Sequence, residues 1–196
     1  MVMDHSTTLN KTELRLVEYV SNCRYLSNRT AGVTDALYAN ASPMVMERRG
    51  FGAEVAFAKL LNAYPDLTTQ PRFGGYDCVL PSGLRVDVKA VTRRTDHLIV
   101  PLKKNRDLTS VDAYALMLCE TWNQTEQDIK TDYTFLGWCL YHEILDRACL
   151  KTFSTGEAYA KKIRELRPPD ELRHYKHQQH LYRDGASATQ GSEAYA

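Results

Sequence analysis

The chain has 196 residues, of which 43% are hydrophobic and 25% charged, values typical of globular domains that exclude a wholly disordered chain. Twenty-five Lys and Arg residues against 24 Asp and Glu give a net charge of +1, which excludes a polybasic, histone-like protein. No apolar run reaches the roughly 18 residues of a membrane span, and the N-terminus lacks a signal-peptide pattern. We expect one cytoplasmic domain with no membrane partner.

The first third of the chain shows helical patterns. Residues 1–9 are mostly polar and are expected to form a flexible N-terminus, and Thr12 is placed to cap the helix that follows. Helices are predicted where apolar residues recur at helical spacing before a proline or a polar stretch. These helices cover residues 10–28, 34–41 and 50–63, and residues 10–45 form a helical extension of a single domain at 10–183.

After residue 70 the apolar period changes to that of strands. Residues 73–80 and 84–91 flank the turn Pro81-Ser82-Gly83, and residues 84–91 alternate apolar and polar side chains, which predicts a hairpin. Further apolar runs predict strands, followed by a helix, a basic segment and a polar, disordered tail. In chain order these are strands 97–101, 113–120 and 134–140, helix 141–149, basic segment 161–167 and tail 184–196.

Two carboxylates of this hairpin are predicted to face each other. A hairpin folded about Ser82 places Asp77 opposite Asp87, with about 5 Å between their Cβ atoms. Such like charges repel, and a bound divalent cation removes the repulsion; oxygen ligands suit Mg²⁺ or Mn²⁺. Lys89 follows Asp87 by two residues on the same strand face, so its ammonium can reach the same site and position or deprotonate a water.

A third acidic residue, Glu54, lies in the predicted helix 50–63. Its neighbours at helical spacing are Phe57, Ala58 and Leu61, so this carboxylate occupies the face that is expected to point inward. Packing alone does not favour an acidic residue at such a position, whereas a site that needs a third carboxylate would favour it.

These residues form the pattern Glu-x22-Asp-x9-Asp-Val-Lys on helix, strand and strand, which resembles the PD-(D/E)xK nuclease superfamily, common in bacteriophages and bacteria. Tyr76 occupies the position of the proline in the motif. The resemblance covers residues 48–173. It implies an α/β fold: a restriction-endonuclease-like αβββαβ core with a mixed sheet flanked by helices. It also implies a Mg²⁺- or Mn²⁺-dependent endonuclease that hydrolyses DNA. The implied metal ligands are Glu54, Asp77, Asp87 and the Val88 carbonyl, and Lys89 completes the catalytic set.

A basic run follows the predicted site. Seven basic residues against two acidic ones lie between Arg85 and Arg106, and such a patch is suited to binding DNA phosphates, although solvated loops also carry such charges. The expected nucleic-acid-binding residues are Arg48, Arg49, Arg93, Arg94, Lys103, Lys104 and Arg106.

Other functions stay open from the sequence. The fold of a nuclease could serve a non-catalytic module that binds nucleic acid or a partner protein, or an RNA-directed nuclease, and a homodimer is compatible with either. A cluster of histidines at spacing three, His174, His177 and His180, is conceivable as a metal site but is better explained as a polar helix face. Cys119 and Cys139 lie in apolar strands, which favours core packing over thiol chemistry.

Overall fold

The computed structural model describes residues 5–32, 42–71, 75–94, 97–102, 110–119, 132–153 and 156–175. Its helices and strands form two sheets with helices on either side, which confirms the α/β class with a mixed sheet. The elements in chain order are β1 (Ser6–Thr8), α1 (Lys11–Thr30), α2 (Pro43–Leu61), β2 (Tyr64–Pro65), β3 (Cys78–Val79), β4 (Arg85–Val91), β5 (His97–Pro101), β6 (Ala113–Leu118), β7 (Asp132–Leu140), α3 (Tyr141–Ile144), β8 (Leu150–Phe153), β9 (Gly156–Lys162) and α4 (Pro169–His174), with 3-10 turns at Arg147–Cys149 and Ile163–Glu165.

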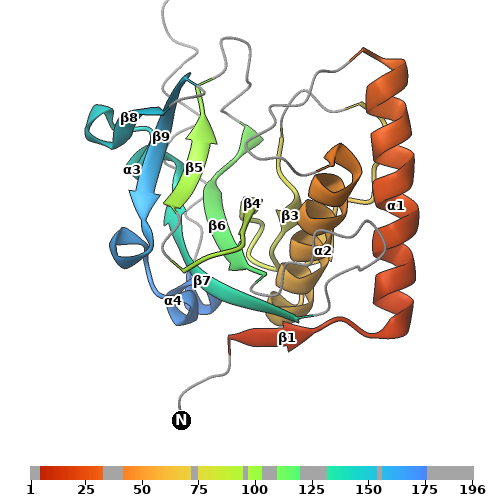
Figure 1. The fold of residues 1–196 in the computed structure, drawn as a ribbon. Helices are drawn as coiled ribbons and strands as arrows, with labels where there is room; N and C mark the ends of the chain where they lie inside the picture. The colour runs from red at the N-terminus through yellow and green to blue at the C-terminus, as the bar shows by residue number, and fades with distance from the viewer. Residues whose placement is uncertain are drawn as a thin grey trace, which may run out of the picture.

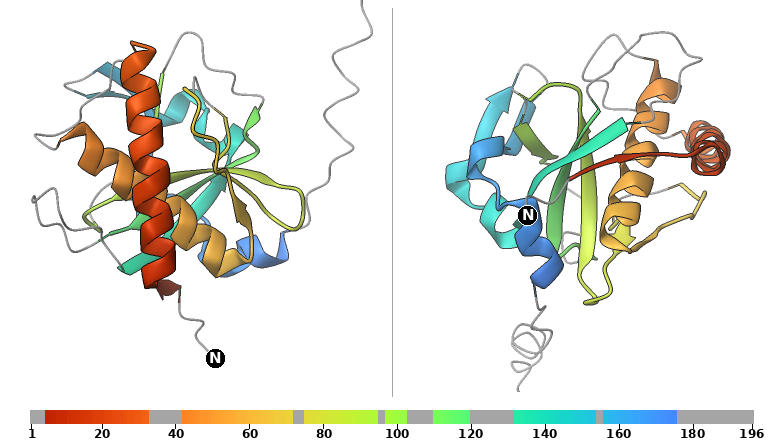
Figure 2. Two further views of the ribbon diagram at one scale, coloured as in Figure 1. Left: turned by 90° about the vertical axis from the view of Figure 1, so that its right-hand side faces the viewer. Right: turned by 90° about the horizontal axis from the view of Figure 1, so that it is seen from below.

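The elements are stacked in layers (Figures 1 and 2). The main sheet has the strand order β1-β7-β6-β4-β3-β2, in which β4 and β6 are parallel and all other neighbours antiparallel. Helix α2 packs on one face of this sheet with α1 outside it, and the second sheet, β5-β9-β8, lies on the other face. One hydrophobic core therefore lies beneath α2, and a second one lies between the two sheets. Among the described helices, none is long and apolar enough to cross a membrane.

The two long helices begin at well-defined caps. The side chain of Asn10 accepts hydrogen bonds from the backbone of Thr12 and Glu13, and the Glu13 carboxylate accepts one from the Asn10 backbone in return. The cap is therefore Asn10, and the prediction that Thr12 has this role was wrong. Helix α2 begins at Pro43, earlier than predicted, after the N-cap Ser42, and residues 51–58 are all buried.

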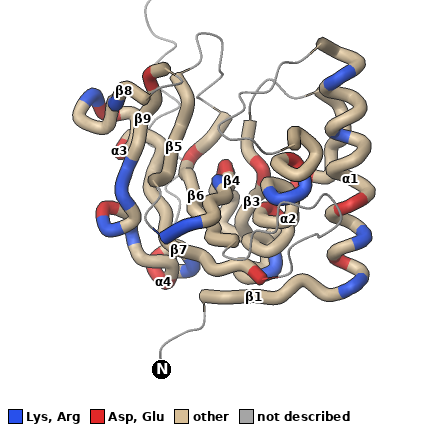
Figure 3. Tube along the Cα trace, viewed as in Figure 1, with Lys and Arg blue, Asp and Glu red and all other residues tan. Residues whose placement is uncertain are grey.

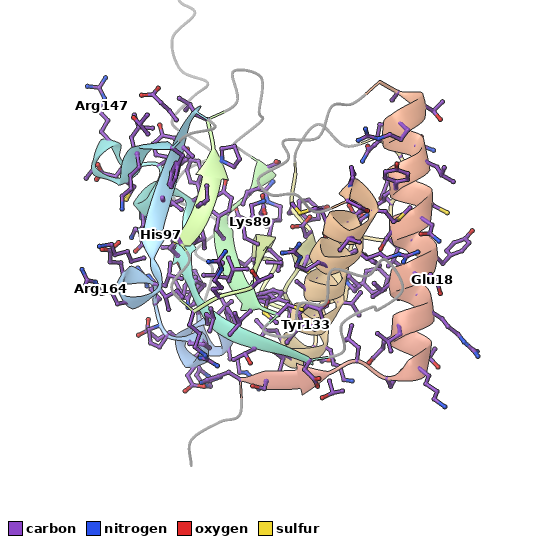
Figure 4. All side chains as sticks on the ribbon, in the orientation of Figure 1. Glu18, Lys89, His97, Tyr133, Arg147 and Arg164 are labelled. Carbon is purple, nitrogen blue, oxygen red and sulfur yellow. The ribbon has the colours of Figure 1, made fainter. Side chains whose placement is uncertain are left out.

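Gly52 of α2 lies against Tyr133 of the main sheet. A Cβ atom at this position would overlap the hydroxyl of Tyr133, a buried residue of β7 that Figure 4 labels. A glycine inside a helix ordinarily costs about 0.5–1 kcal/mol relative to alanine. Here the missing side chain is what allows the Tyr133 ring to lie against the helix.

We therefore expect Gly52→Ala to lower the free energy of unfolding by roughly 1–3 kcal/mol, because overpacking outweighs the gain in helix propensity. The matched control is Gly50→Ala in the same helix, where a Cβ atom meets nothing within 4 Å and stability is expected to rise slightly. Urea unfolding of both variants measures the effect. If Gly52→Ala is as stable as Gly50→Ala, the packing of Tyr133 against α2 is wrong.

The predicted hairpin register is confirmed. Cys78 pairs with Val86 and Val79 with Arg85, which is the register centred on Ser82. The ladder ends there: Asp77 precedes β3, and its N–H donates to the Val86 carbonyl, so the exact pairing of Asp77 with Asp87 stays a prediction. Gly83 has a φ angle of +83°, a left-handed conformation that closes the three-residue turn. On its other side, β4 runs parallel to β6, which places the fully buried run of β6 at the centre of the sheet.

Several segments differ from their predictions. Residues 6–8 are not frayed but form β1, because their hydroxyls and backbone pair with the edge of β7, where no apolar pattern is needed. The predicted helix at 141–149 ends at Ile144, since Asp146 caps a separate 3-10 turn and its carboxylate accepts a hydrogen bond from the Ala148 N–H. β3 is shorter than 73–80, and β8 and β9 were not predicted. The predicted helix at 34–41 and tail at 184–196 lie outside the described residues.

Candidate functional site

Asp87 and Lys89 lie on the face of the main sheet that is turned away from α2. Val86 and Val88 belong to the core beneath α2, and successive side chains of a strand point to opposite faces. Asp87 and Lys89 therefore face the space between the two sheets, where Tyr114 is the register partner of Asp87 on β6. In the view of Figure 4, Lys89 lies between the second sheet and α2.

The carboxylate of Asp87 is buried and paired with Lys89. The side chain of Asp87 is only 3% exposed, and the Lys89 ammonium contacts its Oδ1 atom. An ionised carboxylate in such surroundings is costly unless a cation compensates it. The side chain of Lys89 is 30% exposed, so the residue that neutralises the buried Asp87 carboxylate is itself at the protein surface.

Asp77 is held against β4 just before β3 begins. Its backbone N–H donates to the Val86 carbonyl at 2.8 Å, and its Oδ2 accepts from the Val88 N–H at 2.8 Å. The N–H and C=O of one strand residue point to the same neighbouring strand, so the Val88 carbonyl lies on the Asp77 side of β4. The Asp77 carboxylate and the Val88 carbonyl are thus oxygen donors on the same side of β4. Val88 directly follows Asp87 in the sequence.

Glu54 is buried as predicted, at 7% exposure, but its partner is a cation from α1. Arg24 Nη1 donates to both carboxylate oxygens of Glu54, at 3.2 and 3.0 Å, and Arg24 is itself 4% exposed. Glu54 was predicted to converge with Asp77 and Asp87 on a metal. In the described part of the chain, no three His, Cys, Asp or Glu side chains form a group that could hold a metal ion together. The structure pairs Asp87 with Lys89, holds Asp77 against the backbone of β4, and pairs Glu54 with Arg24.

Lys and Arg residues are distributed over several elements, α1 and α2 among them (Figure 3). The predicted DNA-binding residues that the structure describes lie in two places. Arg93 and Arg94 are exposed in the turn after β4. Arg48 and Arg49 are half-buried on the first half of α2, where Arg48 donates to the Asn22 side chain at 3.2 Å. Burial lowers the pKa of Arg49, while nearby Cys119 and Tyr133 raise it. Lys103, Lys104 and Arg106 lie outside the described residues.

Arg93 and Arg94 follow the carboxyl end of β4. Cys119, the residue after β6, donates its backbone N–H to the carbonyl of Val91 at the end of β4, so the two parallel strands end side by side. The turn with Arg93 and Arg94 begins directly after this end of β4. Two exposed basic residues therefore lie at the carboxyl end of β4.

Two residues of the site were missed by sequence reasoning. Arg24 falls on the buried face of α1 with Val17, Val20 and Ser21, and a basic residue in such a row signals a buried acidic partner. Tyr114 is buried within an apolar run, which hides the fact that the parallel pairing of β4 and β6 places it beside Asp87. No local pattern in the sequence predicts the pairing of β4 with β6.

The secondary candidates have no support from the described residues. Cys119 and Cys139 are buried, as predicted. Burial raises the pKa of the Cys139 thiol to about 12, so the thiolate needed for nucleophilic chemistry is absent at neutral pH. His174 is exposed at the end of α4, and His177 and His180 lie outside the described residues.

Comparison of the chain with models of protein families gave no match, and comparison with curated proteins gave none either.

Proposed function

We propose that the protein is a metal-dependent nuclease of the PD-(D/E)xK type that hydrolyses phosphodiester bonds of DNA, as an endonuclease. The observation that carries the proposal is the buried carboxylate of Asp87 paired with the partly exposed side chain of Lys89, on the strand whose Val88 N–H donates to the carboxylate of Asp77. Two acids on adjacent strands of a hairpin repel each other, and a bound cation would compensate their charge.

The order of elements supports the proposal in part. Helix α2 followed by β2, β3 and β4 gives the αβββ half of the expected core, and β6 is a later strand parallel to β4. Between β4 and β6, residues 97–101 form β5 of the second sheet in the place where the superfamily has a helix. Residues 103–109 of this connection lie outside the described residues.

The donors at the site fit a hard cation. The carboxylates of Asp77 and Asp87 and the carbonyl of Val88 are oxygen donors, and Mg²⁺ is commonly held by one or two carboxylates while it keeps several waters. A bound divalent cation would lower the pKa of a water and stabilise negative charge on the phosphate. Asp77 and Asp87 would hold it, and the Lys89 ammonium would orient the attacking water and supply positive charge beside it.

The basic residues at the carboxyl end of β4 indicate the class of substrate. Arg93 and Arg94 are exposed at the carboxyl end of β4, and guanidinium groups bind phosphate oxygens with two parallel hydrogen bonds. Contacts of this kind fix the position of a nucleic acid without reading its sequence. We therefore propose that the phosphate backbone of DNA binds at this end of β4.

A second candidate is a non-catalytic module that binds nucleic acid. It is favoured by the observation that Asp87 and Glu54 both have a cationic partner within the chain, Lys89 and Arg24, so neither needs a metal to balance its charge. In this case the basic residues would bind nucleic acid, and Asp77, Asp87 and Lys89 would only stabilise the hairpin.

Cleavage assays separate the two candidates. We expect cleavage of at least one of linear, circular, single-stranded and branched DNA with Mg²⁺ or Mn²⁺, none with EDTA, and binding without efficient cleavage with Ca²⁺, whose coordination is longer and looser. RNA of the same sequences tests the RNA-directed alternative. Binding to these nucleic acids without cleavage in any metal would favour the non-catalytic module, and cleavage in EDTA would contradict metal dependence.

A further inference from the structure

Arg24 connects three segments of the chain through one buried guanidinium. Besides the two hydrogen bonds to Glu54 of α2, its Nη2 donates to the Asp66 carbonyl at 2.6 Å and its Nε to the Thr68 carbonyl at 3.1 Å. The guanidinium also lies over the ring of Phe51, 4.4 Å from its centroid. Helix α1 is therefore joined by Arg24 to α2 and to the segment between β2 and β3.

The hydrogen bonds continue from this segment to Asp77. The backbone N–H of Asp66 donates to the carbonyl of Asp77 at 2.7 Å, and the Asp77 carboxylate accepts from the Val88 N–H on β4. Within this segment, the Thr68 N–H donates to the Asp66 side chain at 2.8 Å, and this hydrogen bond restrains the backbone between them. An unbroken path of hydrogen bonds thus runs from Arg24 through Asp66 to Asp77 and Val88.

We infer that Arg24 is a positioning residue, which fixes Asp77 by holding the segment at 66–68 against α2. The inference rests on the proposed function, because it concerns the geometry of the same candidate metal site. Glu54 then acts as the anchor of Arg24 rather than as a metal ligand. Its two carboxylate oxygens and the carbonyls of Asp66 and Thr68 surround a cation that the chain itself supplies.

The guanidinium is required by the geometry of these acceptors. Its planar group offers five N–H donors in a fixed arrangement, and Arg24 uses Nη1 toward Glu54 of α2 and Nε and Nη2 toward the 66–68 segment. A lysine ammonium at the same position carries the charge but cannot span all of these acceptors at once. Arg24→Lys therefore removes the connection to the 66–68 segment while it retains a cation for Glu54.

The test combines amide hydrogen exchange with Mn²⁺ binding on the full chain. The Asp66 and Val88 amides report on the path, and the Leu116 amide in the central strand β6 reports on global unfolding. We expect Arg24→Lys to speed exchange at Asp66 and Val88 at least tenfold beyond any change at Leu116, and to weaken Mn²⁺ binding at least tenfold. The matched control is Arg167→Lys, which alters another Arg–Glu pair, in which the Arg167 guanidinium donates to the Glu143 carboxylate and not to the 66–68 segment. It should leave both readouts within twofold of the wild type.

Each outcome decides the inference. Unchanged exchange at Asp66 and Val88 overturns it, and so does faster exchange in a variant that binds Mn²⁺ like the wild type. If the wild type binds no Mn²⁺, the proposed metal site fails, and exchange alone then decides whether Arg24 positions Asp77. If Arg24→Lys does not fold, the double variant Arg24→Met with Glu54→Gln, which removes both buried charges, is measured in the same way against the same expectations.

Discussion

Replacement of Lys89 by alanine is expected to lower the rate of DNA cleavage at least 100-fold while leaving Mn²⁺ affinity within a few-fold of the wild type. The ammonium contacts Asp87 and the side chain is partly exposed, so it is placed to act on the attacking water but is not a metal ligand. Groups that transfer or hold a proton in the transition state contribute about 10²–10⁴-fold to rates. Single-turnover cleavage and Mn²⁺ titration, carried out on the same preparation, separate the two effects.

Lys59→Ala is the control for this substitution. Lys59 is also a lysine in an ion pair, with Glu13 at 2.9 Å, but it lies on α2 and contacts the N-terminal segment instead of the site. Its removal should leave cleavage unchanged. Full activity of Lys89→Ala would remove Lys89 from the mechanism and leave the pair with Asp87 as a purely stabilising contact.

Glu54→Gln is expected to destabilise the protein by about 3 kcal/mol, because it leaves the buried guanidinium of Arg24 without its counter-charge. Sequence reasoning alone leads to the opposite sign, since three converging acids repel one another when no metal is bound. The difference arises because Arg24, rather than Asp77 and Asp87, faces Glu54. Urea unfolding at neutral pH in the presence of EDTA measures the effect without any contribution from metal.

Glu143→Gln provides the comparison. Its partner Arg167 has a side chain 36% exposed, so solvent compensates part of the lost interaction and the loss should be well below that of Glu54→Gln. A Glu54→Gln variant as stable as the wild type would mean that the pair with Arg24 contributes nothing, and would return Glu54 to the list of candidate metal ligands.

The hairpin at the centre of the site could be predicted because its information is local. The turn Pro81-Ser82-Gly83 and the alternation of residues 84–91 set the register, and the register sets which side chains lie opposite each other. The burial of Glu54 followed in the same way from helical spacing. Its partner did not, since Arg24 precedes it by 30 residues in a different helix and no spacing rule links the two.

The parts of the fold that were missed have weak local patterns. β1 is polar because it adds to the edge of a sheet, and β8 and β9 form a small sheet that buries only one face. That β5 leaves the main sheet to join β9 depends on pairing between distant segments, which periodicity does not report. The path from Arg24 to Asp77 depends on the same kind of distant contact.

Equilibrium binding of Mn²⁺ to the wild type, Asp77→Asn and Asp87→Asn tests most directly whether these carboxylates form a metal site. Asp112→Asn serves as the control, because Asp112 is a half-buried carboxylate that is bound to Arg85 at the start of β4. The account predicts one site in the wild type and in Asp112→Asn, with affinity lowered at least tenfold in each of the other two variants. Equal affinity in all four proteins, or no binding by the wild type, would contradict it.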